Sequence, residues 1–290
     1  MVASDPNSAK LLKPFLEGKD LKKWRQESRK LWLIYIPKGR VQIDDFPAIK
    51  KWLLPFKKAL EKRATKQEWF ELQQAQEAYS PHFGKTKIAY PHFNQEPNFG
   101  LETAGAFSND KSYIIPTDDL FLLAYLNSSV GWFYLSNLAP AVRGGFHELR
   151  VQYVEQLPIP SPAKSVKDNI VKTTDALLTT YAAMQKKQRD FARRIPDLCP
   201  SGAGPALSSK LKEWWRLVDF ASFRAEVKKV YKADIPLSER SDWEDWFQND
   251  KAAIAAYASD ILEHEARIDH LVYGMFKLTP EEIKLIDTAI

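Results

Sequence analysis

The sequence predicts an α+β protein, in which a curved mixed β-sheet with packed helices is followed by a long antiparallel helical hairpin. In the first half of the chain, short runs of β-branched and aromatic residues alternate with helical patterns. The segment EQLPIPSPAK at 155–164 then places three prolines within five residues, which favours a break between domains. Beyond it, two long apolar stripes recur at helical spacing. We therefore divide the chain into an α+β domain at 1–160 and a helical domain at 161–290.

Three short segments in the first domain predict β-strands. They are LWLIYIP at 31–37, KIAYP at 87–91 and SYIIP at 112–116. Each combines β-branched and aromatic residues and stops at a proline, which cannot donate a hydrogen bond to a neighbouring strand. We therefore expect each strand to end at its proline.

One helical pattern in the first domain carries both apolar and basic residues. It spans FPAIKKWLLPFKKALEKR at 46–63, where Ile49, Trp52 and Phe56 share an apolar face and lysines fill the other face. Pro55 stands in the middle, and a proline inside a helix removes a hydrogen bond and clashes with the preceding turn. We expect a basic helix that is kinked or divided in two at this residue.

The second domain is dominated by two apolar stripes. The first, from Val166 to Phe191, predicts a helix of about 28 residues. The second, from Ile254 to Met275, alternates spacings of three and four residues, which is typical of a coiled-coil seam. The simplest arrangement is an antiparallel pair. Between the stripes, residues 200–249 predict an aromatic-rich helical insertion that begins with a flexible turn, PSGAGP.

Cations are concentrated in the first quarter of the chain. Residues 1–66 contain 17 Lys and Arg against 7 Asp and Glu, whereas the whole chain has a net charge of only +5. This asymmetry suits contact with phosphates. Lys38 and Arg40 stand on a turn after the first strand, and Lys50 and Lys51 stand on the basic helix. A solvated turn explains the first pair equally well.

A second candidate segment surrounds the strand KIAYP. Lys85 and Lys87 stand at its start, and His92, Phe93 and Asn94 follow its end. Cations, stacking rings and an amide that can pair with adenine thus occur within a short stretch. This combination slightly favours nucleic-acid binding over an ordinary surface loop.

The strongest candidate follows an apolar helical run that starts at Leu120. Arg143 and Arg150 bracket Gly144 and Gly145, whose missing side chains let the backbone approach a phosphate. A stacking ring and groups that can bond base edges stand nearby, namely Phe146, His147 and Gln152. The glycines also fit a simple turn, and the arginines a helix cap.

Several other chemistries lack support in the sequence. Cys199 is the only cysteine, which excludes an internal disulfide or thiolate cluster and favours a reducing cytoplasm. No glycine-rich phosphate loop is present, and the five histidines never occur at HExxH or HxxxH spacing, so neither a nucleotide site nor a metal site is expected.

The apolar runs are far shorter than the ~20 residues of a membrane helix. We expect a cytoplasmic protein without a secretory signal or membrane contact.

Two other classes of function stay open. Asp219, Glu226 and Lys228 could form a metal-dependent nuclease site, because a divalent metal needs clustered carboxylates and a lysine could assist the attacking water. Solvated positions on a helix explain Glu226 and Lys228 better. The chain could also be a structural module, in which the hairpin dimerises and the basic face has no ligand.

Eight segments, in order along the chain, resemble the C-terminal target-recognition domain of TaqI-type adenine DNA methyltransferases and type IIG restriction-modification enzymes, which is related to type I specificity subunits. The segments are LLKPFLEGKDLKKW, WLIYIPKG, FPAIKKWLLPFKKALEKR, WFELQ, KTKIAYPHF, LLAYLNSSVGWFYL, RGGFHELRVQYVEQLPIP and LVYGMFKLTPEEIKLID. The last of them ends at Asp287, so the resemblance covers nearly the whole chain.

The resemblance implies that residues 1–160 form a target-recognition domain for double-stranded DNA. A separate methyltransferase domain or subunit would bind S-adenosylmethionine and methylate a flipped adenine. The catalytic [NDS]PP[YFW] motif and the glycine-containing cofactor loop of complete members are missing here, since no PP dipeptide occurs. We expect no cofactor in this chain, which would be the recognition half of a longer enzyme or a free-standing specificity subunit. The resemblance leaves open Mg²⁺ and DNA cleavage by the parent enzyme.

The same resemblance suggests how the domains would share the work. The helical hairpin would set the distance to a partner domain or a second recognition module, as spacer helices do in type I subunits. Besides the cations of the candidate segments, further lysines would contact phosphates and position the domain. These lysines are Lys10, Lys13, Lys19, Lys22, Lys23, Lys57 and Lys58.

Overall fold

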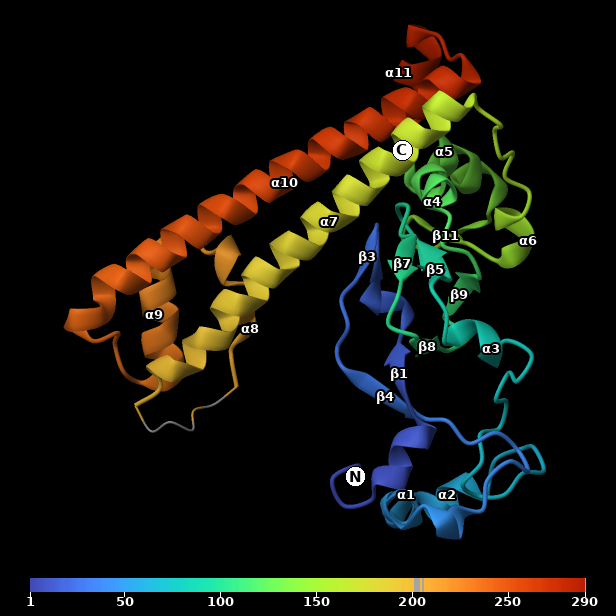
Figure 1. The fold of residues 1–290 in the computed structure, drawn as a ribbon, viewed down its shortest axis with the longest axis vertical. Helices are drawn as coiled ribbons and strands as arrows, with labels where there is room; N and C mark the ends of the chain where they lie inside the picture. The colour runs from blue at the N-terminus through green and yellow to red at the C-terminus, as the bar shows by residue number, and fades with distance from the viewer. Residues whose placement is uncertain (201–203, 205, 290) are drawn as a thin grey trace. The chain divides into compact units, whose positions relative to one another are not determined.

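The computed structural model has the predicted α+β fold (Figure 1). It describes residues 1–200, 204 and 206–289, which fall into two compact units. The predicted turn at 200–205 lies mostly outside the described residues.

Unit 1 comprises Met1–Pro162 and Val272–Ile290, and unit 2 comprises Ala163–Leu271. The first break falls in the proline run, where the sequence predicts a domain boundary. The second break lies inside helix α10 (Arg240–Phe276). The C-terminal residues thus belong to unit 1, whereas the sequence pattern placed them in the helical domain.

All three predicted strands of unit 1 form, although the first of them, β4 (Leu31–Ile34), ends before Pro37 and not at it. Strand β5 (Lys87–Pro91) lies between β7 (Gly100–Glu102) and β9 (Ser112–Ile115), and both pairings are antiparallel. All five residues of β5 are buried, as expected for the middle strand of a covered sheet.

A second sheet of unit 1 is mixed. Strand β1 (Leu12–Leu16) pairs antiparallel with β4 (Leu31–Ile34) and parallel with β8 (Phe107–Ser108). Strands β2 (Leu21–Lys22) and β3 (Arg25–Gln26) pair separately. The single curved sheet expected from the sequence is therefore divided into small sheets in the described part of the chain. The strands are two to five residues long, so none can carry a continuous hydrogen-bond ladder across the unit.

The basic helical segment is divided at Pro55, as predicted. Helix α1 (Pro47–Leu53) continues through a 3₁₀ turn, η4 (Leu54–Phe56), into the short helix α2 (Lys57–Leu60). Ile49 of α1 packs into a small apolar core with Leu11, Ile36, Ile43 and Phe46. The other 3₁₀ turns of unit 1 are η1 (Pro6–Leu11), η2 (Gly18–Asp20) and η3 (Ile43–Asp45).

Helices cover the other end of unit 1. Helix α4 (Leu120–Asn127) begins at the cap Asp119, and its last residue exchanges two hydrogen bonds with the backbone of Phe99. Helix α5 (Ser129–Leu138) follows at once and packs against the C-terminal helix α11 (Pro280–Ala289). This packing explains why the C-terminus belongs to unit 1. The remaining helices are α3 (Ser80–Phe83) and α6 (Val151–Val154).

Unit 2 contains the predicted antiparallel hairpin. Helix α7 (Lys164–Arg194) and the unit 2 part of α10 lie side by side (Figure 1). The Nζ of Lys187 lies 2.9 Å from Asp250 Oδ1, and an Arg267 guanidinium nitrogen lies 3.2 Å from Asn169 Oδ1. The two helices are therefore antiparallel.

Aromatic packing holds the helical insertion against the hairpin of unit 2. Phe191 of α7 stacks on Trp214 with ring centroids 3.9 Å apart, and it also contacts Phe223 of α9 (Phe220–Tyr231). The indole N–H of Trp214 donates to the Gln188 carbonyl at 3.0 Å. The remaining elements are η5 (Ile195–Leu198), α8 (Ser209–Lys212), η6 (Trp214–Arg216) and η7 (Leu237–Glu239).

Candidate nucleic-acid interface

The structure brings two predicted DNA-contact segments into one sheet. Strand β11 (Phe146–Glu148) pairs with β10 (Ala141–Val142) on one side and with β6 (Phe93–Asn94) on the other. His147 lies opposite Asn94, and the backbone N–H of the residue after β11 donates to the His92 carbonyl at 2.7 Å. Segments about fifty residues apart in sequence therefore form one surface.

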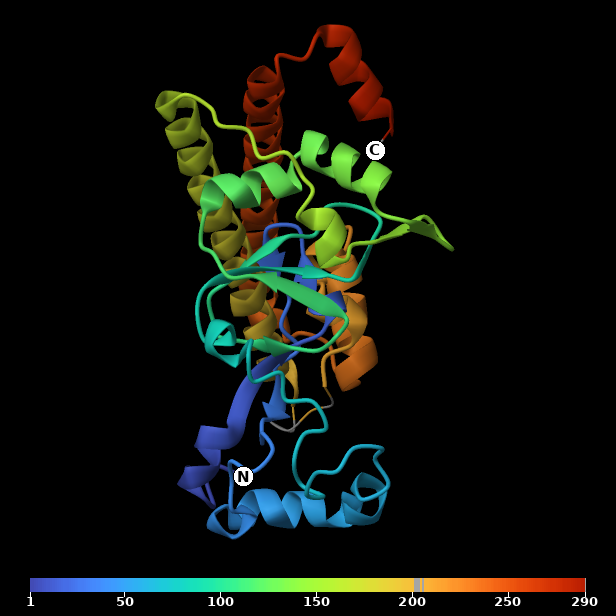
Figure 2. The same ribbon diagram turned by 90° about the vertical axis from the view of Figure 1, so that its right-hand side faces the viewer.

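The tip of the β10–β11 hairpin is built from Arg143, Gly144 and Gly145. Both glycines have positive φ angles, +86° and +75°, which residues with a Cβ rarely adopt. The Gln95 side chain fixes the tip by donating to the Gly144 carbonyl at 2.8 Å. Arg143 is exposed and has no hydrogen bond or ion pair with a described residue, and the hairpin projects from unit 1 (Figure 2). Its guanidinium is thus free to meet a phosphate or a base.

A triad of Glu148, Arg150 and His92 lies where the hairpin joins β6. Glu148 Oε1 lies 2.8 Å from an Arg150 guanidinium nitrogen and 3.0 Å from His92 Nε2. Hydrogen bonding from Arg150 holds the pKa of Glu148 below its ordinary value, and Glu148 in turn raises the pKa of Arg150. Arg150 is therefore partly compensated, unlike Arg143.

Beside the hairpin, a cavity of about 610 Å³ opens in unit 1. It lies between the loops around η2, after β5 and before β9, and Phe146 reaches it from the hairpin. Two carboxylates, Glu17 and Glu96, line it, but amides, lysines and two aromatic rings are more numerous, and this set can bond base edges, contact phosphates and stack on bases. These lining residues are Asn94, Gln95, Asn98, Asn109, Lys19, Lys22, Lys111, Phe93 and Phe146.

Two predicted contact residues are buried instead. Lys87 is 1% exposed, forms an ion pair with Glu102 and donates to the Phe83 carbonyl at 2.7 Å. Asn94 is also 1% exposed, and its Nδ2 donates to the Pro91 carbonyl at 2.6 Å. Lys87 lies directly opposite Glu102 in the β5–β7 pairing, so the two charges satisfy each other. We leave Lys87 and Asn94 out of the proposed contact surface.

The predicted cations at 38–40 and on helix α1 do not line this cavity. Lys38 is exposed beside Gly39, which has the positive φ of a tight turn. Arg40 forms an ion pair with Glu77 at 3.0 Å, and Lys50 pairs with Asp44. Lys51 is exposed without an ionic or hydrogen-bond partner among the described side chains, so it stays available for phosphate contact.

Of three other predicted contact residues, Lys85 and Gln152 are exposed to solvent and His147 is half-buried. Lys85 is exposed just before β5, and Gln152 is exposed on α6. His147 is half-buried, with Nδ1 3.3 Å from the Ala139 carbonyl and its ring edge against Trp132. Lys85 and Gln152 can therefore meet a ligand directly, whereas His147 mainly packs the base of the hairpin.

The predictions missed several polar residues of the cavity. Asn98, Asn109 and Lys111 occur in segments that resemble ordinary turns, NQEPN and SNDK. Their positions become informative only when β5, β7 and β9 bring the loops together, and no local pattern shows this. Gln95 could have been suspected, because it follows the predicted segment at once.

The residues of the nuclease alternative have structural partners. Asp219 caps α9 by accepting the Ser222 backbone N–H at 2.8 Å, and the Ser208 hydroxyl donates to buried Glu226 at 2.8 Å. Lys228 is exposed. In the part of the chain that the structure describes, no three His, Cys, Asp or Glu side chains are grouped to hold a metal ion.

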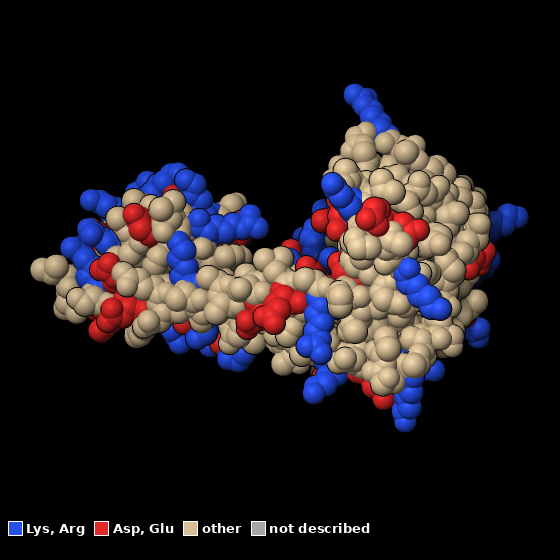
Figure 3. Space-filling view, turned by 90° about the horizontal axis from the view of Figure 1, so that it is seen from above, with Lys and Arg blue, Asp and Glu red and all other residues tan. Residues whose placement is uncertain are grey.

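Charge alone does not locate a contact surface. The face drawn in Figure 3 has many Lys and Arg side chains over unit 2, with Asp and Glu among them, and few over unit 1. Among the helices of the described residues, none is long and apolar enough to cross a membrane. The combination of exposed cations, amides and rings is thus more informative than the net charge.

Comparison with known families divides the chain near the same place as the structure does. The TaqI-like C-terminal specificity domain matches residues 13–159. A domain of unknown function, DUF8810, matches residues 163–272. No curated protein matches the chain. The first match includes both segments of the β6–β11–β10 sheet, and the second covers all of unit 2.

Proposed function

Because the chain belongs to the family of TaqI-like C-terminal specificity domains, we propose that it recognises a short sequence in duplex DNA for a restriction-modification enzyme. The enzyme's methyltransferase domain or subunit would bind S-adenosylmethionine and methylate an adenine at or near this sequence. The sequence supports this division of roles, because no [NDS]PP[YFW] motif occurs in these 290 residues. Cleavage, in a parent enzyme that cuts, would also belong to a partner.

The observation that carries the proposal is the surface formed by the hairpin and the polar cavity. Arg143 stands free at a glycine tip, and exposed Gln95 and Asn109 line the adjacent cavity. Asparagine and glutamine pair with adenine, and arginine with guanine, through two hydrogen bonds at the base edge in the major groove. Gln95 and Asn109 would therefore read bases, and Arg143 would contact a guanine or a phosphate.

Lysines around this surface would hold the DNA backbone. Lys19 and Lys111 are exposed at the cavity, and Lys85 is exposed before β5. Contacts to phosphates set the register of a protein on the duplex but carry no sequence information. Lys38, Lys51 and further exposed cations of the N-terminal region would extend this contact. The expected result is a strong dependence of affinity on salt.

Fluorescence anisotropy with labelled duplex DNA, over a salt series, tests the proposal. We expect salt-dependent binding, and the change Arg143→Ala should weaken it and, if Arg143 contacts a phosphate, reduce the salt slope by about one. A Lys50→Ala, Lys51→Ala double variant should also bind more weakly. Arg216→Ala is the matched control, because Arg216 is a similarly exposed arginine of unit 2.

The result that would contradict the proposal is equally direct. If the chain binds no duplex at low salt, alone or with its methyltransferase partner, the recognition role is wrong. Equal loss of affinity in Arg143→Ala and Arg216→Ala would show binding by diffuse charge, and it would remove the hairpin from the contact surface.

A further inference from the structure

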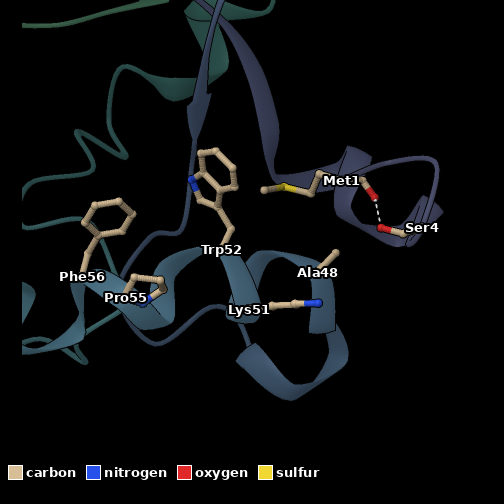
Figure 4. Close-up of a pocket in the computed structure, with 7 residues that line it drawn as sticks. All are labelled: Met1, Ser4, Ala48, Lys51, Trp52, Pro55 and Phe56. Carbon is tan, nitrogen blue, oxygen red and sulfur yellow. Dashed lines mark hydrogen bonds between the residues drawn. The ribbon is translucent and has the colours of Figure 1, made fainter.

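A second cavity, of about 440 Å³, lies on the N-terminal helical part of unit 1, away from the hairpin. Trp52 and Phe56 line it, and they keep 60% and 54% of their surface exposed. Figure 4 shows the Trp52 ring beside the Met1 side chain, with Phe56 beyond Pro55 on the same side of the helix. Large rings are usually buried, so two exposed rings around one hollow indicate a binding surface.

The rim of this hollow carries uncompensated positive charge. Lys51 lines the cavity, whereas Lys58 is exposed nearby on α2, two residues after Phe56, and is not part of the lining. Neither lysine has an ion pair or hydrogen bond with a side chain in the described ranges, whereas the neighbouring Lys50 and Lys57 pair with acidic residues. An occupant must therefore offer a flat apolar face and negative charge together.

A second copy of the chain fits this rim poorly. A symmetric contact centred on this hollow would gather the lysines of both copies in one interface, and like charges in an interface cost free energy. An uncharged apolar partner would bury Lys51 without a counter-charge. A nucleotide meets both needs, because every base has a π-face that stacks on aromatic rings and every phosphate is negative.

We propose that Trp52 and Phe56 form a stacking platform for an unpaired base of the bound DNA, with Lys51 and Lys58 contacting the flanking phosphates. This inference rests on the proposed function, in that DNA is taken as the partner. A base inside a duplex has both faces covered by its neighbours, so only an unpaired or extruded base presents a face to the rings. The platform thus recognises distorted or single-stranded DNA without sequence preference, unlike the polar cavity.

Three duplexes of one sequence test the platform by anisotropy. One is fully paired, one carries a single unpaired 2-aminopurine, and one carries an abasic residue at the same bulge. Base stacking on aromatic side chains predicts that the unpaired base improves affinity about fivefold or more over the other two duplexes, with quenching of 2-aminopurine fluorescence. The double variant Trp52→Ala, Phe56→Ala should lose both the gain and the quenching. Trp52→Phe should keep them.

Trp32→Ala is the matched control, because Trp32 is 62% exposed on β4 and does not line the cavity. Equal affinity of wild type for the paired and the base-bulged duplex overturns the platform and leaves the proposed function intact. A gain that persists in the double variant, or with the abasic bulge, also overturns it. Binding of the bulged duplex alone, lost in the double variant, supports the platform while contradicting duplex recognition.

Discussion

Phe191, Trp214 and Phe223 of unit 2 are fully buried in mutual contact, whereas Trp52 and Phe146 of unit 1 keep more than a third of their surface exposed. The buried rings have one another as partners, and the exposed rings border cavities that also contain lysines. In these two groups of rings, the same residue types therefore serve stability in one place and, by our proposals, binding in the other. What distinguishes the two uses is the surroundings of each ring.

The largest effect that this comparison predicts is in unit 2. Phe191→Ala removes the ring that stacks on Trp214 and should lower the free energy of unfolding by about 3–5 kcal/mol, because the cavity cannot refill fully. Urea unfolding followed by tryptophan fluorescence measures this loss. Leu237→Ala, at a residue 79% exposed, is the control and should change little. A loss below about 1 kcal/mol in Phe191→Ala would show that the ring cluster contributes little to stability.

The second prediction concerns the buried ion pair of Lys87 and Glu102 in unit 1. Lys87→Met leaves Glu102 buried without its cation, which should cost about 3 kcal/mol. We expect this low end of the range because Glu102 still accepts the backbone N–H groups of Ala104 and Ala106. Thermal unfolding should show partial recovery in the double variant Lys87→Met, Glu102→Gln, which removes the charge. No destabilisation in the single variant would contradict the buried pair.

Lys87 also shows where prediction from sequence ends. The strand KIAYP was predicted correctly because its side-chain types and terminal proline are local signals, and the same holds for β9 and for the break at Pro55. The burial of Lys87 depends on Glu102 of the opposite strand, fifteen residues later, and on α3, whose Phe83 carbonyl accepts from the lysine. Cations near a strand look alike in sequence whether they face water or a buried carboxylate.

The candidate site was predictable only in part. The glycine hinge and the free Arg143 follow from the local sequence, but the pairing of β11 with β6 joins segments that no local pattern connects. Asn109 lines the cavity only because β9, which follows it, pairs with the distant strand β5. Likewise, the C-terminal helix α11 packs on α5 of unit 1, although it continues the helical pattern of the second domain. Local signals define elements, and long-range pairing defines the site.

The smallest predicted effect concerns the triad at the base of the hairpin. Arg150→Ala should raise the pKa of Glu148 toward its ordinary value of 4.5, because the main hydrogen bond to the carboxylate is lost. Since the folded-state pKa lies below the unfolded value, the triad stabilises the protein above about pH 4.5, and this contribution is lost as the pH falls through the folded value. The variant should thus differ from wild type near neutral pH and not in acid.

Carbon-detected NMR titration of the Glu148 carboxyl measures this shift. Arg143→Ala is the control within the same hairpin, because Arg143 has no ionic partner among the described residues and should leave the Glu148 pKa unchanged. An unchanged Glu148 pKa in Arg150→Ala would show that the pair seen in the structure does not persist in solution.

The central claim is that the polar cavity beside the hairpin reads bases, and selection from a pool of random duplexes tests it most directly. We predict that the wild-type chain enriches one short motif, and that Asn109→Ala enriches the same motif with one position relaxed, since one base contact is worth about 1–3 kcal/mol. Asn137→Ala, at an exposed amide of α5, should leave the motif unchanged. Enrichment of no motif by the wild type, or of an identical motif by Asn109→Ala, would contradict the account.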